Sequence, residues 1–196
     1  MGSAGFNLSN QFLIAMPGML DDSFAGSVVY LCEHSEKGAL GLVINKPIDI
    51  NLKNLFDKVE LNLEREELAV QPVFYGGPVQ TERGFVLHTD DFNSPDSTVP
   101  LADGLGLTAT RDVLAAMGSR IHRPRRAILA LGYAGWGPEQ LESELSEGAW
   151  VNCDVTPELV FDTPADELWK KSVQRIGIEP EALAARDEAL LGRVVT

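Results

Sequence analysis

The stretch Ser27-Val-Val-Tyr-Leu-Cys-Glu-His-Ser-Glu-Lys-Gly-Ala-Leu-Gly-Leu-Val-Ile-Asn45 predicts a β-hairpin. Its two runs, residues 27–34 and 39–45, are apolar and rich in β-branched side chains, as strands are. The polar loop 35–38 between them ends in Gly38, a residue suited to the close of a hairpin turn. The second strand should stop at Lys46-Pro47, because proline cannot donate a hydrogen bond to a sheet.

Other segments on either side of this hairpin carry strand or helix signals. Apolar runs predict strands at residues 12–16, 73–75, 84–88, 105–108, 127–133, 150–153 and 159–161. Capping residues and helical spacing predict helices at 51–59, 110–118, from Pro138 onwards, 163–177 and 180–191. Residues 89–103 are mostly polar and predict a surface loop. Strands cluster rather than alternate strictly with helices, so the pattern favours an α+β class over a doubly wound fold.

Length and charge limit the classes of function. The chain has 196 residues and a net charge of −13. Such a length typically gives one domain, here 1–196, with residues 1–8 flexible and 180–196 forming a C-terminal helix and tail. No apolar window is long enough to span a membrane, and the first basic residue is Lys37. We therefore expect a cytoplasmic protein without a membrane partner.

Cysteine and histidine chemistry offers one enzymatic hypothesis. Strand alternation places Cys32 and His34 on one face, where a histidine could activate a thiolate for catalysis or redox sensing. Neighbours on one face of a strand lie roughly 6.5–7 Å apart, which makes a direct hydrogen bond difficult. A buried thiol beside a strand-end histidine is the alternative. The set Cys32, His34, His88 and Cys153 has zinc-ligand types but lacks zinc-ligand spacing, so we expect no metal.

Two glycine-containing segments were considered as ligand sites. Gly104-x-Gly106-x-x-Ala109 matches a dinucleotide fingerprint, but Pro100 weakens the preceding strand and no acid follows near position 125, so no cofactor is expected. Residues 132–138, Gly-Tyr-Ala-Gly-Trp-Gly-Pro, join a buried strand to a predicted helix start. A ligand could approach the backbone there between Tyr133 and Trp136. A tight turn with its aromatic rings in the core is the alternative.

Positive charge is concentrated in one short segment. Arg120, Arg123, Arg125 and Arg126 lie around His122, whereas residues 127–169 carry nine acids and no base. Such a cluster could bind an acidic partner or nucleic acid, or it could pair with acids of the same chain. Pro124 and the net negative charge make direct nucleic-acid binding an unfavoured hypothesis.

Ordered motifs over residues 7–178 together resemble the bacterial YqgE/AlgH family. The motifs are Phe12-Leu-Ile-Ala-Met-Pro17, Ser27-Val-Val-Tyr-Leu-Cys-Glu-His34, Gly41-Leu-Val-Ile-Asn-Lys-Pro47, Tyr75-Gly-Gly-Pro78, Arg83-Gly-Phe-Val-Leu-His88, Leu131-Gly-Tyr-Ala-Gly-Trp136 and Gly148-Ala-Trp150. The resemblance implies an α+β domain whose bifurcated sheet folds into a pseudo-barrel with flanking helices. The AlgH name implies a role in transcriptional regulation, but the resemblance implies no settled activity and supplies no established catalytic residues to carry over.

Positions within these motifs are candidates for a shared pocket: Cys32, His34, Asn45, Tyr75, Gly76, Gly77, His88, Tyr133 and Trp136. Our leading hypothesis is a non-enzymatic protein that binds a small ligand or a protein partner and regulates transcription indirectly. The alternatives are a cysteine-based enzyme or redox sensor using Cys32 with His34 or His88, and direct nucleic-acid binding through the arginine cluster.

Overall fold

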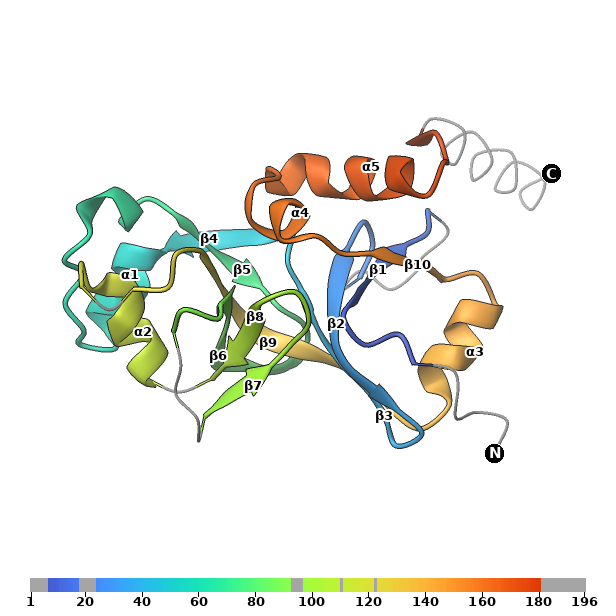
Figure 1. Cartoon of the computed structure of the whole chain (residues 1–196), viewed down its shortest axis with the longest axis horizontal. Coiled ribbons are helices and arrows are strands. Elements are labelled where there is room, and N and C mark those ends of the chain that lie inside the picture. Colours follow the sequence, from blue (N-terminus) through green and yellow to red (C-terminus); the bar gives the residue numbers. More distant parts are fainter. Residues whose placement is uncertain (1–6, 18–23, 93–96, 110, 122, 181–196) are drawn as a thin grey trace.

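The computed structural model describes residues 7–17, 24–92, 97–109, 111–121 and 123–180 (Figure 1). The strands are β1 (Gln11–Ala15), β2 (Val28–Ser35), β3 (Gly38–Val43), β4 (Pro47–Asn51), β5 (Pro72–Tyr75), β6 (Val79–Thr89), β7 (Thr98–Pro100), β8 (Leu105–Thr108), β9 (Ala127–Trp136) and β10 (Trp150–Asp154). The α-helices are α1 (Leu52–Lys58), α2 (Arg111–Gly118), α3 (Gln140–Ser146), α4 (Pro157–Phe161) and α5 (Ala165–Arg175), with a short 3-10 helix, η2 (Glu66–Leu68).

These strands form one curled sheet. The main path runs β10-β1-β2-β3-β9-β6-β8-β7, and its neighbouring strands are antiparallel. Strand β5 pairs in parallel with β9 and antiparallel with β4, so the β4–β5 ribbon branches from the middle of the sheet. The chain is therefore a mixed α+β protein whose mostly antiparallel sheet forms a half-barrel, with five α-helices among the described residues, which confirms the predicted class and architecture.

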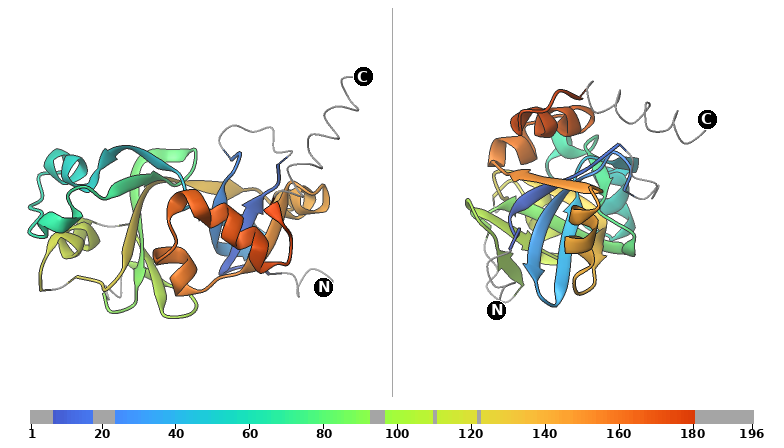
Figure 2. Two further views of the ribbon diagram at one scale, coloured as in Figure 1. Left: turned by 90° about the horizontal axis from the view of Figure 1, so that it is seen from above. Right: turned by 90° about the vertical axis from the view of Figure 1, so that its right-hand side faces the viewer.

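Each face of the sheet packs against different helices. The inner face carries Phe12, Tyr30 and Leu87 and is closed by side chains of α4 and α5 such as Val160 and Leu168. Figure 2 shows α5 lying across the β1–β2 region. The outer face is covered at the β1 end by α3 and at the β6 end by α1 and α2. Strands that are buried on both faces, such as β1 and β2, contain continuous apolar runs rather than alternating ones.

Strand β9 belongs to both ends of the sheet. Its residues Ala127–Leu131 pair with β6 and its residues Ala134–Trp136 pair with β3. Before Gly132 the even-numbered side chains Ile128 and Ala130 face the inner core, whereas after it the even-numbered Ala134 and Trp136 face the outer side. Gly132 has a φ of +81°, so one residue in left-handed conformation reverses the alternation, as a β-bulge does.

Gly76 and Gly77 allow the segment between β5 and β6 to cross β9 at this bulge. A Cβ on Gly77 would lie 2.2 Å from the Tyr133 carbonyl carbon, and one on Gly76 would lie 2.2 Å from the Gly132 oxygen. The Gly76 amide donates to the Leu131 oxygen and its own oxygen accepts from the Val43 amide, both at 2.8 Å. The crossing therefore links β3, β5 and β9 through backbone groups that no side chain could fit between.

Several sequence predictions are confirmed. Strands occur near residues 12–16, 73–75, 84–88, 105–108 and 150–153, and the hairpin forms as expected. Helix α1 begins after Asn51, whose side chain accepts from the Asn54 amide in a capping box. Helix α5 follows Pro164 as predicted. Thr110 and residues 181–191 lie outside the described residues, as do residues 1–6 of the predicted flexible start.

Other predictions were wrong for identifiable reasons. Residues 157–161 form helix α4 rather than a strand, because Thr156 caps the Leu159 amide and Pro157 occupies the first turn. Strand β9 continues to Trp136, so residues 132–136 are not a turn, and α3 begins at Gln140 rather than at Pro138. The predicted 89–103 loop contains β7, and the chain resumes a strand, β4, at Pro47. Pro47 starts that strand, a position where a missing amide donor is tolerated.

The glycine crossing should fail when a methyl group is added. We expect Gly77→Ala to lower the free energy of unfolding by about 3 kcal/mol or more, because its Cβ would overlap backbone atoms at a φ of +151°. Gly148→Ala is the matched control, since φ is +81° but no atom lies within 4 Å, and it should cost only about 1 kcal/mol. Urea unfolding measures both, and equal small losses would contradict the crossing.

Candidate functional site

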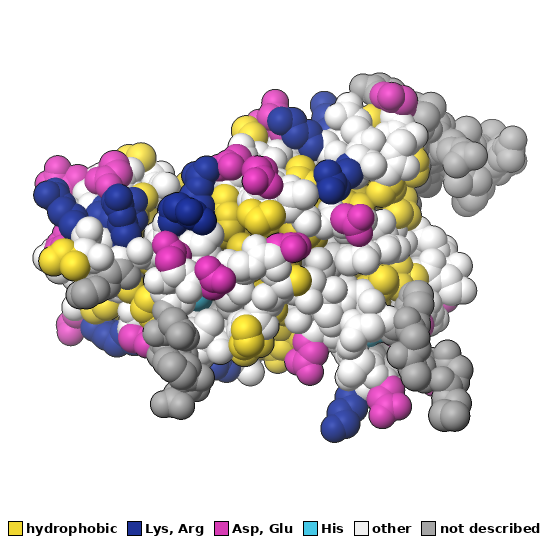
Figure 3. Space-filling view, viewed as in Figure 1, with side chains coloured by type: hydrophobic (Ala, Val, Ile, Leu, Met, Phe, Trp, Pro, Cys, Tyr) yellow, Lys and Arg dark blue, Asp and Glu magenta, His cyan; other side chains and the backbone are white. Residues whose placement is uncertain are grey.

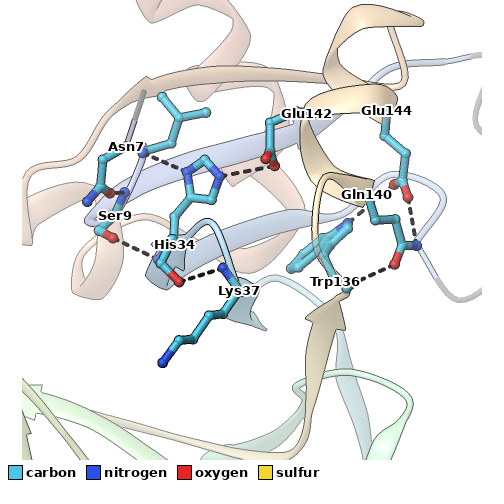
Figure 4. A network of polar contacts seen from close by, with 11 residues as sticks. Asn7, Ser9, His34, Lys37, Trp136, Gln140, Glu142 and Glu144 are labelled. Atoms are coloured by element: carbon cyan, nitrogen blue, oxygen red, sulfur yellow. Dashed lines mark hydrogen bonds and ion pairs between the residues drawn. The ribbon is translucent and has the colours of Figure 1, made fainter. Parts of the chain in front are cut away.

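The predicted pocket residues do not surround one common cavity in the described structure. His34 and Trp136 face α3 on the outer side of the sheet (Figure 4). His88 lies in β6 and contacts β8, whereas Cys32 and Tyr133 belong to the inner core. A ligand pocket shared by all of these residues therefore stays a prediction.

His34 holds three segments together at the base of α3. The side chain is 1% exposed, and its Nδ1 accepts from the Leu8 amide at 3.0 Å. Nε2 therefore carries the proton and donates to Glu142 Oε1 at 3.1 Å. The arrangement ties the N-terminal segment and the hairpin to α3 (Figure 4). Cys32 faces the inner core whereas His34 faces α3, because a bulge between Leu31 and Glu33 interrupts the alternation of β2. The predicted placement of both side chains on one face was therefore wrong.

Trp136 is also bound to α3 through a carboxylate. The indole N–H groups of Trp136 and Trp150 both donate to Glu144 Oε1, at 3.3 Å and 2.9 Å. Their rings meet edge to face with centroids 5.8 Å apart. This aromatic pair lies in the outer core. Trp136 therefore packs inside the protein, as the alternative to a ligand site at residues 132–138 predicted. Tyr133 is half-buried and packs edge to face against Phe85.

His88 is fully buried in a directed chain of hydrogen bonds. Its Nδ1 donates to the Thr89 oxygen at 2.7 Å, so its Nε2 accepts from the Thr108 hydroxyl, also at 2.7 Å. Thr98 in turn donates to Thr108 at 2.7 Å. Burial lowers the pKa of His88, which favours the neutral ring that this chain requires. Strands β6, β7 and β8 are thereby linked below the surface.

Asn45 and Cys32 have structural contacts. The Asn45 side chain accepts from the Val28 amide at 2.9 Å and donates to the Gly26 oxygen at 3.0 Å, which fixes the turn before β2. Cys32 and Cys153 are free and buried. Burial raises the pKa of the Cys32 thiol to about 12 and that of Cys153 to about 11, so neither forms a thiolate readily.

A cavity of about 340 Å³ opens between the α4–α5 connection and the β4–β5 branch of the sheet. It lies within the lower part of the volume range of small-molecule sites. Its walls include Phe74 of β5, Ile128 of β9 and Phe161 of α4. Figure 3 shows hydrophobic side chains reaching the surface next to α4, with Lys or Arg side chains on their left. The fold therefore leaves an apolar recess where its two branches separate.

Three arginines line this cavity and no acidic residue does: Arg65, Arg125 and Arg126. Arg65 donates to Glu67 Oε1 at 3.2 Å and contacts the Met117 oxygen. Arg126 forms an ion pair with Asp162 at the end of α4. The Arg125 amide donates to Asp91, but within the described part of the chain its guanidinium makes no hydrogen bond or ion pair.

The arginine cluster predicted from the sequence is therefore divided between two settings. Arg125 and Arg126 line the cavity, whereas Arg120 bonds to Glu64 through its amide and its Nε, each at 3.2 Å. Arg123 is exposed, and His122 lies outside the described residues. Sequence reasoning missed Arg65, Phe74, Ile128 and Phe161. They come from separate segments, and no local pattern signals that the branch of the sheet brings them together.

Metal and dinucleotide sites find no support in the geometry. Within residues 7–17, 24–92, 97–109, 111–121 and 123–180, no three His, Cys, Asp or Glu side chains are grouped to hold a metal ion. Gly106 lies inside β8 against the His88 ring rather than at a helix start. No helix in the described part of the chain is long and apolar enough to cross a membrane.

Comparison with known proteins defines the class and then the family. The half-barrel matches the solution structure of AlgH from Pseudomonas aeruginosa with a TM-score of 0.75 and 41% identity, over 93% of this chain and 96% of that one. A crystal structure of a protein from Corynebacterium diphtheriae shares the fold, with a TM-score of 0.67 and 21% identity over 90% of this chain and 89% of that one.

Sequence relatives agree with the structural match. A UPF0301 protein from Ralstonia nicotianae is 55% identical over 92% of this chain and 94% of its own length. One from Verminephrobacter eiseniae is 53% identical over 90% of this chain and 92% of its own length. The AlgH-like family model matches residues 12–181. The chain belongs to the AlgH-like family, which confirms the resemblance seen in its motifs.

Acidification should destabilise the protein through His88. Because burial holds the folded-state pKa below the unfolded value of about 6.5, the unfolded chain binds more protons as the pH falls through that value. The contribution of His88 to stability is thus present above about pH 6.5 and is lost below it. We expect His88→Asn, whose amide can still donate to the Thr89 oxygen, to show a smaller loss of unfolding free energy between about pH 7 and about pH 5. Urea titrations at several pH values measure this, and equal slopes would contradict it.

Proposed function

We propose that this AlgH-like protein is a cytoplasmic, non-enzymatic binding protein that takes a small ligand into the cavity beside α4. One observation carries the proposal. A recess of about 340 Å³ is lined by apolar side chains together with arginines, and it exposes polar as well as apolar surface. Apolar walls with a few placed polar groups are typical of small-molecule sites. The buried free thiols fit a reducing compartment.

Indirect regulation follows as part of this proposal. Ligand binding beside Arg126 would act on its ion pair with Asp162, and so on the position of α4 and α5. A change there would alter the surface offered to a protein partner. Direct nucleic-acid binding has less support, because the four arginines of the cluster lie in two settings. The Arg126 side chain is paired with Asp162, and the Arg120 Nε donates to the Glu64 backbone oxygen.

Filling the cavity tests the proposal. The probe is N-phenyl-1-naphthylamine, an uncharged dye that fluoresces in apolar surroundings. Ala165 lines the cavity at the start of α5, so we expect Ala165→Trp to weaken dye binding by about tenfold or more. Ala115→Trp is the control on the exposed face of α2 and should bind the dye like the wild type. Equal dye binding by both variants, or none by the wild type, would contradict the proposal.

The cysteine-based alternative can be tested separately. Because burial raises the Cys32 pKa to about 12, we expect the native Cys153→Ser variant to react with Ellman's reagent at least about 100-fold more slowly than free cysteine near neutral pH. The same variant unfolded in urea should react at the ordinary rate, which controls for reagent quality. Fast reaction of the native thiol would favour a cysteine enzyme or redox sensor instead.

A further inference from the structure

We propose that the ligand of the cavity is a small organic anion with one carboxylate or phosphate group on a short apolar body. This inference rests on the proposed function and goes further, since it assigns the chemical class. Three kinds of group line the recess: aromatic and aliphatic side chains, a few neutral polar ones, and the cationic side chains of Arg65, Arg125 and Arg126. The charge lining the site is therefore positive only, in a chain whose net charge is −13.

Arg125 is the group that binds the anion. Its backbone is held by the hydrogen bond from its amide to Asp91 at 2.8 Å, which positions the residue without using its side chain. The guanidinium has no hydrogen bond or ion pair within the described residues, although acids outnumber bases by 29 to 16 in the chain. A guanidinium presents paired N–H donors that match a carboxylate or a phosphate.

The other two arginines are occupied by partners of the chain itself. Arg65 is tied to Glu67 and to the Met117 oxygen, and Arg126 to Asp162. A bound anion near Arg126 competes with the Asp162 carboxylate for the same donors. Arg125 is therefore the primary contact, and the neighbouring ion pairs keep the local positive charge from attracting a second anionic group.

Apolar side chains in the lining favour a ligand with an apolar body over a bare inorganic anion. Phe74, Ile128 and Phe161 are half-buried, so each still exposes apolar surface within or beside the recess. Covering such surface is favourable by about 25 cal/mol per Å², a gain that only a ligand with an apolar body can make. The volume of about 340 Å³ limits the whole ligand to a small molecule.

Displacement of the neutral dye by matched aliphatic probes tests the charge requirement. The probes are octanoate, octanamide and octylammonium, which share one chain and differ in the head group. We expect octanoate to displace the dye at concentrations about tenfold lower than octanamide, and octylammonium to be the weakest. Arg125→Met should remove the advantage of octanoate over octanamide, and Arg125→Lys should restore part of it.

Arg123→Met is the matched control, because Arg123 is exposed in the same segment and does not line the cavity. It should bind octanoate like the wild type. Equal displacement by octanoate and octanamide in the wild type would overturn the assignment of an anion, and so would unchanged octanoate binding in Arg125→Met. Either result leaves the proposed binding function supported, provided that Ala165→Trp still weakens dye binding by about tenfold or more. Failure of that cavity variant refutes the binding function itself.

Discussion

The close approach of Gly76-Gly77 to Gly132-Tyr133 is the contact on which the rest of the architecture depends. Backbone atoms meet there at distances that exclude a Cβ, and Gly76 bonds to both Val43 and Leu131. At the same point the bulge at Gly132 exchanges the faces of β9. One strand can thus pair with β6 on one side of the crossing and with β3 on the other. Without this exchange, the side chains of β9 would alternate in one phase along its whole length. At one end of the sheet, its apolar side chains would then face the opposite side from the one they occupy.

The cavity is a consequence of the same branching. Strand β5 pairs with β9 over only Phe74 and Tyr75 and then crosses it, so the β4–β5 ribbon leaves the main sheet. Helices α4 and α5 close the inner core on the other branch. The recess lies between the β4–β5 ribbon and helices α4 and α5, and residues from both line it. The lining combines side chains of β5, β9 and α4 with Arg65 and Arg125, which lie in irregular segments.

The sequence predicted local elements well where a regular pattern of apolar side chains is bounded by a clear capping or turn residue. The 27–45 hairpin, the Asn51 cap and the Pro164 helix start each depend on neighbours in the chain. It failed at β9, because the glycine-rich segment 132–136 predicts a turn, whereas Gly132 provides space for another backbone and the strand continues to Trp136. The cavity could not be predicted for a related reason. Arg65, Phe74, Arg125 and Phe161 become neighbours only through the crossing, a tertiary constraint without a local pattern.

The charge distribution favours a small anion over a polyanion as the ligand of this protein. Screening limits the reach of exposed charges to about 8 Å at physiological ionic strength. A small ligand inside the recess therefore interacts mainly with the arginines that line it, whereas a nucleic acid extends well beyond that distance and meets the acids that give the chain its charge of −13. Affinity for nucleic acid requires many phosphates to be neutralised together, and two of the cavity arginines are already neutralised by Glu67 and Asp162. The same arrangement leaves one guanidinium for one anionic group, so the positive segment of this acidic chain is suited to a monovalent ligand with an apolar body.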